Sequence, residues 1–251
     1  LLAVTQVWSA PGRKGQALVA AKGAPEAIAS LCRLSAKDRK LMSKAVNEMA
    51  GEGLRMLGVA RATFSGRSLP KSPRSFAFEF AGLVGLRDPL RASVPDAVAQ
   101  SRSAGIRVIM ITGDYPATAR AIALQAGIPC ENAVTGDDLA KLDDPALAAL
   151  LKAATVFARI MPEQKLRIVN ALKADGDIVA MTGDGVNDAP SLKAAHIGVA
   201  MGGRGTDVAR EASSIVLLDD DFGSIVKAVR LGRRIFDNLQ KAMGFIVAIH
   251  V

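Results

Sequence analysis

The stretch Ile178-Val-Ala-Met-Thr-Gly-Asp-Gly-Val-Asn-Asp-Ala-Pro190 decides which fold this sequence predicts. Its first four residues are apolar, and a short apolar run bounded by a turn favours a buried parallel strand. A turn with two glycines follows, and Asn187 to Pro190 begin a helix. This order places Asp184 and Asp188 at the carboxyl end of a strand, where open α/β sheets hold their ligands.

The chemistry of this turn indicates a site for a hard cation. Mg²⁺ is usually bound by one or two carboxylates together with the phosphates of its substrate. Asp184 and Asp188, beside the glycine amides and Asn187, provide such a set. The alternative is a Gly-Asp turn that only precedes a capped helix, and for an isolated Gly-Asp-Gly sequence that alternative would be preferred.

The second half of the chain alternates apolar strands with helices. Strands are predicted at residues 106–111, 155–158, 178–181, 196–201 and 214–218. Thr112-Gly113-Asp114 follows the first of them, Arg159 follows the second, and Lys165 lies on the first turn of the next helix. His196 has no partner pattern and is interpreted as structural. The alternation predicts an α/β fold with a doubly wound parallel sheet.

The first 86 residues predict part of an α+β domain. Residues 2–8 and 16–21 form a predicted hairpin around a turn at residues 11–15. Helices are expected over residues 25–34 and 35–50, and strands over residues 53–63 and 76–86. Ser35 is the expected cap of the second helix, with Leu41, Ala45 and Met49 on one of its faces.

Length and composition exclude several classes of protein. A chain of 251 residues can bury a sizeable core, and its 50% hydrophobic content argues against disorder. The net charge of +8 admits nucleic acid, an anionic membrane surface or a nucleotide as partner. The basic residues are scattered, however, and only 4% of residues are aromatic, so no nucleic-acid binding is expected. Cys32 and Cys130 have no metal-binding spacing and indicate a reducing compartment.

Nine consecutive residues, 182–190, closely resemble the hinge signature of the P-type ATPases, which are ion pumps with a haloacid-dehalogenase-like core. Four further motifs resemble segments of that family and occur in its order. They are Lys22-Gly-Ala-Pro-Glu26, Gly53-Leu-Arg-Met-Leu57, Asp88-Pro-Leu-Arg91 and Phe157-Ala-Arg-Ile-Met-Pro-Glu-Gln-Lys165. The resemblance covers nearly the whole chain. Residues 186–193 and 219–225 resemble calcium and related cation pumps more than heavy-metal pumps.

The resemblance implies a set of nucleotide-binding residues. Lys22 would line the adenosine pocket, with Gly23 beside it, and Arg55 would reach the phosphates through its bidentate guanidinium. Arg159 would contact the nucleotide or support a residue that does. From the residues alone, Lys22 is more commonly a solvated lysine and Arg55 a charge on an edge strand, so both alternatives stay open.

The resemblance also implies a catalytic set for phosphoryl transfer from ATP to an enzyme aspartate. The turn Thr112-Gly113-Asp114 and Lys165 would grip the γ-phosphoryl group. Asp184 would bind Mg²⁺, and Asn187 and Asp188 would support the phosphate and the metal, with Asp188 as a second metal ligand. The alternative for Lys165 is a solvent-facing lysine that pairs along its own helix.

One element of the family pattern is absent. The phosphorylation motif Asp-Lys-Thr-Gly-Thr occurs nowhere in the 251 residues, so we expect a pump fragment without its nucleophilic aspartate. Two groups of aspartates mimic a nucleophile motif. Asp175 and Asp177 lie in the turn that enters the central strand, at its wrong end, and residues 219–221, three aspartates after an apolar strand, come too late in the order. Two alternatives stay open: a soluble haloacid-dehalogenase-type phosphatase, and a non-catalytic nucleotide-binding module.

Three segments follow from the resemblance. They are a partial nucleotide-binding domain (1–87), a partial phosphorylation domain (88–232) and a stalk that begins a membrane helix (233–251). Residues 243–251 are almost wholly apolar but far fewer than the roughly 20 that span a bilayer. A basic helix that continues into an apolar run is expected at the cytoplasmic end of a membrane helix, whereas the alternative is a buried C-terminal helix. We expect an integral membrane parent protein with this segment on its cytoplasmic side. Its partners would be ATP, membrane lipid and a cation bound elsewhere in the parent protein.

Overall fold

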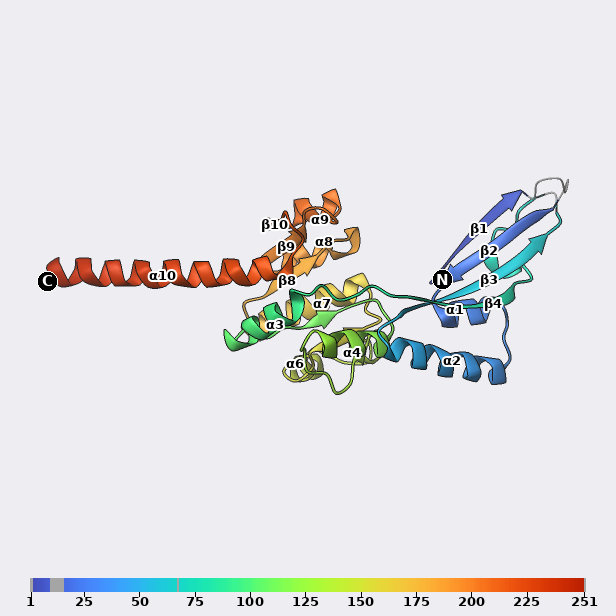
Figure 1. Ribbon diagram of the computed structural model, residues 1–251, viewed down its shortest axis with the longest axis horizontal. Helices are drawn as coiled ribbons and strands as arrows, with labels where there is room; N and C mark the ends of the chain where they lie inside the picture. The colour runs from blue at the N-terminus through green and yellow to red at the C-terminus, as the bar shows by residue number, and fades with distance from the viewer. Residues whose placement is uncertain (1, 10–15, 67, 251) are drawn as a thin grey trace. The chain divides into compact units, whose positions relative to one another are not determined.

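The computed structural model describes residues 2–9, 16–66 and 68–250. Its internal contacts divide the chain into two compact units (Figure 1). The antiparallel unit comprises Leu1–Pro89 and Asp114–Ile122, and the parallel unit comprises Leu90–Gly113 and Ala123–Val251. The predicted domain limits at residues 87 and 232 stay a prediction, because this division by contacts does not assign domain roles.

The antiparallel unit contains, in the part that the structure describes, a four-stranded sheet in the order β1-β2-β3-β4. The strands are β1 (Ala3–Ser9), β2 (Ala17–Gly23), β3 (Arg55–Phe64) and β4 (Glu79–Leu86), and the helices are α1 (Pro25–Leu31), α2 (Ala36–Gly51) and the short η1 (Pro73–Ser75). The predicted hairpin is confirmed, since β1 pairs with β2 in antiparallel register. Its predicted turn at residues 11–15 lies outside the described residues.

One face of this sheet is buried and the other is open. Along β3, buried residues alternate with exposed or half-buried ones, as a sheet covered on one side requires. On the covered face, Val19 and Ala60 pack with Ile28 of α1 and with Phe76 from the segment after η1. Gly58 lies directly under α1, where a Cβ atom would come within 2.9 Å of the Ile28 Cβ. The glycine therefore allows the helix to approach the sheet closely.

Helix α2 begins as predicted but buries a different face. The Ser35 hydroxyl accepts a hydrogen bond from the Asp38 amide at 3.2 Å, which confirms the cap. The residues buried on α2 are Met42, Val46 and Ala50. On the predicted face of Leu41, Ala45 and Met49, Met49 packs against this core but Leu41 is 60% exposed. Both stripes have the same spacing of four residues, so only docking against β3 and β4 decides between them.

The parallel unit contains two sheets, each with three parallel strands among the described residues, in the orders β5-β7-β6 and β10-β9-β8. The strands are β5 (Met110–Ile111), β6 (Val134–Thr135), β7 (Val156–Ala158), β8 (Ala180–Gly183), β9 (Ile197–Met201) and β10 (Ile215–Leu217). The helical segments are α3 (Val94–Ser103), α4 (Pro116–Gln125), α5 (Gly136–Leu139), α6 (Asp144–Leu151), α7 (Pro162–Ala174), η2 (Val186–Asp188), α8 (Ala189–Ala194), α9 (Asp207–Ala212) and α10 (Phe222–His250). Helices alternate with parallel strands, which confirms the predicted α/β fold class.

The parallel strands do not form one continuous sheet. β5 and β8 are each an edge strand of their own sheet in the described part of the chain. The expectation of a buried strand beginning at Ile178 was wrong, because β8 begins at Ala180 and Ile178 is 78% exposed. Ile178 lies two residues before β8, in the segment that leads into a strand paired with β9.

The core of the parallel unit is centred on β7. Phe157 is fully buried there and packs with Leu139, Leu147 and Ile168 from the surrounding helices. The sequence predicts an amphipathic helix over residues 137–152 that Pro145 interrupts, and the interruption is confirmed because α5 and α6 are separate. The Arg167 guanidinium closes the connection between them by donating to carbonyl oxygens of α5 and the loop, at 3.1 and 2.7 Å, and to the Asp144 carboxylate at 2.9 Å.

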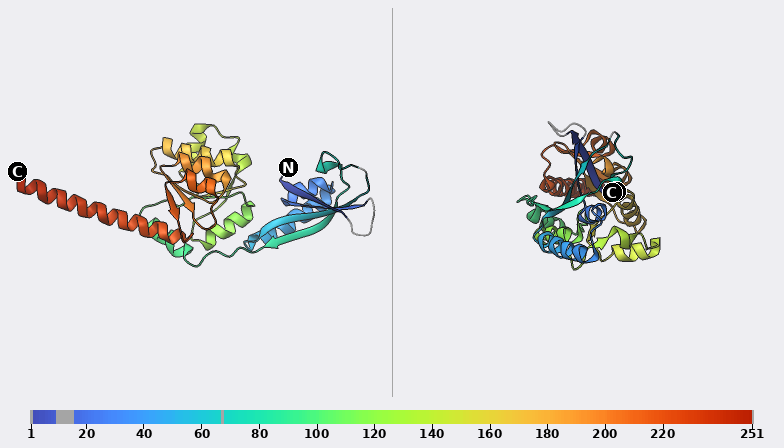
Figure 2. Two further views of the ribbon diagram at one scale, coloured as in Figure 1. Left: turned by 90° about the horizontal axis from the view of Figure 1, so that it is seen from above. Right: turned by 90° about the vertical axis from the view of Figure 1, so that its right-hand side faces the viewer.

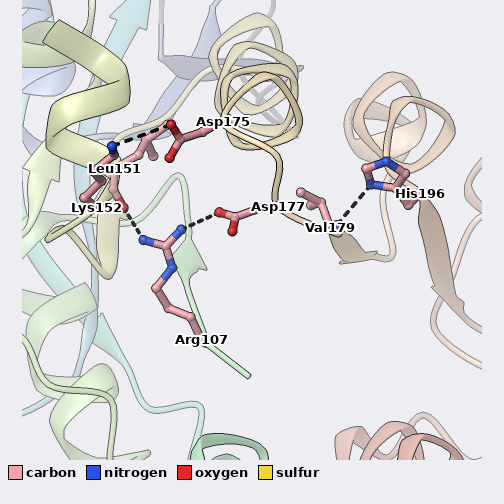
Figure 3. Close-up of polar contacts among 7 residues, drawn as sticks. All are labelled: Arg107, Leu151, Lys152, Asp175, Asp177, Val179 and His196. Carbon is pink, nitrogen blue, oxygen red and sulfur yellow. Dashed lines mark hydrogen bonds and ion pairs between the residues drawn. The ribbon is translucent and has the colours of Figure 1, made fainter. Parts of the chain in front are cut away.

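Polar contacts join the residues that precede β5 to those that precede β8 (Figure 3). The Arg107 guanidinium donates to the Leu151 carbonyl and, at 2.8 Å, to the Asp177 carboxylate. The Nδ1 atom of His196 accepts the Val179 amide at 3.1 Å, so His196 supports the backbone before β8, in agreement with its structural interpretation. The amino ends of β5 and β8 are thus held together without pairing of the two strands.

Three adjacent aspartates fix the connection between β10 and α10. The Asp219 carboxylate accepts from the Ser224 hydroxyl and the Asp221 carboxylate from the Ser93 hydroxyl, each at 2.7 Å. Asp220 accepts from two loop amides, those of Gly203 and Arg204, each at 2.9 Å. The hydrogen bond from Gly203 is the main cause that lowers the pKa of Asp220 below its ordinary value.

Replacing Phe157 by alanine should destabilise the parallel unit by about 3 to 5 kcal/mol, because it leaves a cavity in the core around β7. The matched control is Leu218→Ala, since Leu218 lies 89% exposed beyond β10 and its truncation should change stability by less than about 0.5 kcal/mol. Chemical unfolding followed by circular dichroism measures both. Equal effects of the two changes would contradict the assigned core.

Changing Asp220 to asparagine should lower stability at neutral pH and have little effect in strong acid. The native pKa of Asp220 is depressed, so its carboxylate stabilises the fold above the unfolded pKa of about 3.9, and this contribution disappears as the pH falls through the native value. Urea unfolding of both proteins at several pH values measures the difference. A difference that does not shrink in acid would contradict the assigned hydrogen bonds.

Candidate functional site

The predicted catalytic residues of the parallel unit lie at the carboxyl ends of its strands. Thr112 and Gly113 follow β5, Arg159 follows β7, and Asp184 follows β8. β5 and β7 are neighbours: the Thr112 amide donates to the Phe157 carbonyl at 2.9 Å, and the Thr112 carbonyl accepts from the Ile160 amide at 3.1 Å. The ends of open parallel sheets are where such folds bind ligands.

A close contact between two predicted catalytic residues joins Lys165 to Asp188. The Lys165 ammonium lies 2.6 Å from Oδ1 of Asp188, and the two side chains are 17% and 10% exposed. Oδ2 of Asp188 also accepts the Gly185 amide at 3.1 Å. Lys165 is therefore not the solvent-facing lysine of the alternative interpretation. The pair connects the first turn of α7 with the turn after β8.

Local sequence explains why Lys165 and Asp188 meet. A Cβ atom on Gly183 would come within 2.6 Å of the Asp188 Cβ, so the glycine leaves the space that Asp188 fills. On the other side, Gln164 anchors the start of α7: its Oε1 accepts the Met161 amide at 3.0 Å, and its Nε2 donates to the Gly136 carbonyl at 2.8 Å. Gln164 was not predicted, although glutamine at the third position of a helix is a capping signal.

Asp184 is exposed beside this pair and differs from Asp188 in its surroundings. Its backbone carbonyl accepts the Thr206 amide at 2.9 Å, and Thr206 caps α9 through the Ala209 amide. Among the described residues, no cationic side chain forms an ion pair with the Asp184 carboxylate. Asn187 is also exposed in the η2 turn. The site thus offers one open carboxylate and one that is neutralised by a lysine.

This set of donors fits Mg²⁺ with few protein ligands. The described residues contain no group of three or more histidine, cysteine, aspartate or glutamate side chains placed to hold a metal ion. Mg²⁺ does not need such a group, since it commonly keeps several waters and takes one or two carboxylates plus substrate phosphates. Asp184 provides an accessible carboxylate of this kind. The assignment of Asp184 and Asp188 as metal ligands stays a prediction.

Asp114 belongs to the antiparallel unit, whereas Thr112 and Gly113 belong to the parallel unit. Within that unit its carboxylate lies 3.4 Å from Nε of Arg55. Asp114 was predicted with the catalytic turn and Arg55 with the nucleotide site. This ion pair brings two predicted site residues together in the antiparallel unit. Their catalytic and nucleotide-binding roles stay predictions.

The remaining predicted nucleotide residues lie on β2. Lys22 is exposed on the open face of the sheet and opposite Val59 of β3. Arg55 lies on β3 four residues before Val59, which is about 13 Å along the strand, and it faces the same side of the sheet as Lys22. Gly23 has a packing reason of its own, because a Cβ atom there would lie 2.3 Å from the Leu2 carbonyl oxygen.

The aspartates that could mimic a nucleophile all have structural roles. Those at residues 219–221 accept hydrogen bonds that fix the start of α10. Asp175 pairs with Lys152 at 3.6 Å and Asp177 with Arg107 at 2.8 Å, both near the amino end of β8 (Figure 3). None of these hydrogen bonds and ion pairs involves Lys165 or Asp188.

Comparison with known proteins gives consistent matches. A model of the haloacid dehalogenase-like hydrolases matches residues 20–196. Calcium-transporting ATPase 1 of Saccharomyces cerevisiae is 45% identical over 224 residues, which cover 87% of this chain and 24% of the yeast protein. Calcium-transporting ATPase 1 of Bacillus cereus is 45% identical over 218 residues, covering 86% and 24% of the two chains. Sodium/potassium-transporting ATPase subunit alpha-2 of Homo sapiens is 40% identical over 282 residues, covering 92% and 27%.

The chain spans about a quarter of the length of the curated relatives it matches. Its match to the hydrolase model includes the strand ends after β5, β7 and β8, where the candidate site lies. The resemblance to cation pumps is confirmed by relatives whose names are those of calcium-transporting and sodium/potassium-transporting ATPases. The chain therefore belongs to the haloacid dehalogenase-like hydrolases, and over most of its length it is similar to P-type cation-transporting ATPases.

Proposed function

We propose that the chain is the cytoplasmic part of an ATP-driven cation transporter in which a phosphoryl group passes from ATP to an enzyme aspartate. The observation that carries this proposal is the ion pair of Lys165 and Asp188 beside the open carboxylate of Asp184. A fixed positive charge and a carboxylate open to a metal, both at the ends of parallel strands, suit a transferring phosphoryl group. The names of the relatives support cation transport as the process that this phosphoryl transfer drives.

In this transfer an oxygen of the acceptor carboxylate forms a bond to the γ-phosphorus, while the bond from that phosphorus to the bridging oxygen breaks and ADP leaves. Lys165 stabilises the negative charge on the phosphoryl oxygens, and Asp188 holds its ammonium group in place. The Thr112 side chain and the Gly113 amide orient the same group. Asp184 would hold Mg²⁺, which supplies further neutralisation of the phosphate charge when it is bound.

The acceptor aspartate is proposed to lie outside these 251 residues. No Asp-Lys-Thr-Gly-Thr motif is present, and the candidate substitutes at residues 219–221 are occupied by hydrogen bonds. β5 and β8 each have an unpaired edge in the described part of the chain. A parallel strand pairing with these edges would bring its own carboxyl end to the level of Thr112 and Asp184. We therefore infer that such a strand carries the acceptor.

The antiparallel unit is proposed to bind the nucleotide, and α10 to continue toward the membrane. Lys22 and Arg55 lie on the open sheet face, where a base and phosphates can be reached. No helix among the described residues is both long and apolar enough to cross a membrane. A soluble phosphatase that uses Asp219 is the competing function, and the hydrogen bond from Ser224 to that carboxylate disfavours it.

Asp184→Asn in the full-length protein should lower the rate of phosphoenzyme formation from ATP and Mg²⁺ by at least about 100-fold, because it removes the open carboxylate. The matched control is Asp137→Asn, since Asp137 is an exposed carboxylate at the start of α5. Labelling with radioactive ATP measures the rate, and circular dichroism checks the fold. Normal labelling of the Asp184 variant would contradict the proposal that Asp184 holds Mg²⁺.

The chain of 251 residues alone should form no acid-stable phosphoprotein from labelled ATP, because stabilising groups without a nucleophile cannot form a covalent intermediate. Addition of the segment that bears the phosphorylation motif, in the same chain or as a separate piece, should restore labelling. Gel autoradiography after acid quenching measures both.

The control for this experiment is the double change Asp219→Asn and Asp221→Asn. If the chain alone becomes labelled and this change abolishes the label, residues 219–221 contain the nucleophile. The protein would then be a phosphatase-like enzyme with a different order of motifs. If nucleotide binds but no segment restores labelling, the chain is a non-catalytic nucleotide-binding module.

A further inference from the structure

A loop after β9 contacts the backbone of the proposed metal ligand Asp184. Loop 202–206 consists of Gly202, Gly203, Arg204, Gly205 and Thr206. The Thr206 amide donates a hydrogen bond of 2.9 Å to the Asp184 carbonyl. The Thr206 hydroxyl also caps α9 by accepting the Ala209 amide at 3.2 Å, which fixes the orientation of the residue. The loop therefore supports the backbone of Asp184 at the carboxyl end of β8.

Loop 202–206 is a tight turn rich in glycine. Three of its five residues are glycines, which lose more conformational freedom on folding than any other residue. A Cβ atom on Gly205 would come within 1.9 Å of the Met201 carbonyl oxygen, so the turn closes too tightly for a side chain there. An ordered turn of this composition needs contacts from outside the loop.

Two side chains outside the loop bind its backbone groups. The Asp220 carboxylate accepts the amides of Gly203 and Arg204, each at 2.9 Å, and so uses both of its oxygens. The Arg210 guanidinium donates to two carbonyl oxygens of the loop, one of them at 3.1 Å. Asp220 thus binds the donors of the loop, and Arg210 binds its acceptors.

Asp220 lies in the connection between β10 and α10. Its φ of 53° is in the left-handed region, which is uncommon for residues other than glycine and is enriched at functional sites. The connection is fixed to the segment before α3: Asp221 accepts the Ser93 hydroxyl at 2.7 Å, and the Arg91 guanidinium donates to the Asp220 carbonyl. It leads into α10, which begins beside the strands drawn in orange and then runs past them (Figure 2). Asp220 is therefore held in place itself and can anchor the loop.

We propose that Asp220 is a positioning residue for Asp184. Its carboxylate holds loop 202–206, and the Thr206 amide of that loop keeps the Asp184 backbone in place. This inference rests on the proposed function, in which Asp184 holds Mg²⁺. Removal of a residue that supports a metal ligand typically lowers metal affinity or activity by about 10- to 100-fold. Because Asp220 acts through the loop, we expect the lower end of that range.

The first measurement is amide hydrogen exchange of the full-length protein, read by mass spectrometry without added metal. Asp220→Gly should raise exchange in residues 202–208 by at least about 10-fold, as the loss of hydrogen bonds to a charged group predicts. Exchange in the turn of residues 182–188 should rise in the same variant. Glycine adopts the left-handed conformation readily, so the change reports the lost carboxylate and not a distorted backbone. Exchange in α7 should stay unchanged.

The second measurement is the Mg²⁺ dependence of phosphoenzyme formation from ATP. Asp220→Gly should raise the Mg²⁺ concentration that gives half the maximal rate by about 10-fold. The rate at saturating Mg²⁺ should change little, because Asp184 is still present. A variant that is only less stable would yield less active protein with a normal Mg²⁺ requirement. Asp220→Asn keeps one acceptor oxygen, so it should show a smaller shift in the same direction and serves as the test if the glycine variant does not fold.

The matched control is Asp219→Asn, which removes a carboxylate from the same connection. Among the described residues, the Asp219 carboxylate accepts the Ser224 hydroxyl and the Asp221 amide, and neither belongs to the loop. The control should leave the exchange of residues 202–208 and the Mg²⁺ requirement unchanged. Equal shifts in the Asp219 and Asp220 variants, or no shift in either, would overturn the positioning role.

The variant Asp184→Asn, measured beside these, separates this inference from the proposed function. If Asp184→Asn blocks labelling while Asp220→Gly keeps a normal Mg²⁺ requirement, the proposed function stands and the positioning role alone is wrong. If Asp184→Asn is labelled normally, the proposed metal role of Asp184 is wrong, and the positioning role toward a metal fails with it.

Discussion

The candidate site of the parallel unit depends on the ion pair between Lys165 and Asp188. Its side chains are 17% and 10% exposed, so both charges are largely removed from water. Removing one partner of such a pair typically costs about 3 to 5 kcal/mol, whereas replacing both by apolar residues is often neutral or stabilising. Stability therefore does not explain why a lysine and an aspartate occupy these positions. A fixed positive charge at the strand ends, where phosphate would bind, does explain it.

Two side-chain contacts of the parallel unit lie at opposite ends of its strands. Lys165 and Asp188 join the carboxyl end of β7 to that of β8, while Arg107 and Asp177 join the residues before β5 to those before β8. Both contacts are made by side chains, so the two sheets associate without backbone pairing between β5 and β8. The open edges of these strands therefore lie in one folded unit, as the proposed acceptor strand requires.

Local signals predicted the elements of this fold well. Ser35 caps α2, and Pro145 separates α5 from α6, because capping and proline geometry act over a few residues. The placement of Asp184 at a strand end followed equally from the glycine turn. These features depend on the neighbouring sequence alone.

Features that depend on distant contacts were not predictable in the same way. The buried face of α2 is shifted by one residue from Leu41 to Met42, since docking decides between two equivalent stripes. Ile178 is exposed because β8 begins two residues later, at Ala180, and a run of apolar residues does not show where a strand begins. The burial of Lys165 and the anchoring by Gln164 arise from segments more than 20 residues apart.

A double-mutant cycle in the full-length protein tests the central claim most directly. Lys165→Gln, Asp188→Asn and the two changes combined would be compared by the rate of phosphoenzyme formation from ATP. If the pair acts as one device at the phosphoryl site, each single change should slow the reaction strongly and the combined change should cost little more. Fully additive losses, or normal rates in the single variants, would show that the two residues do not act together on the phosphoryl group.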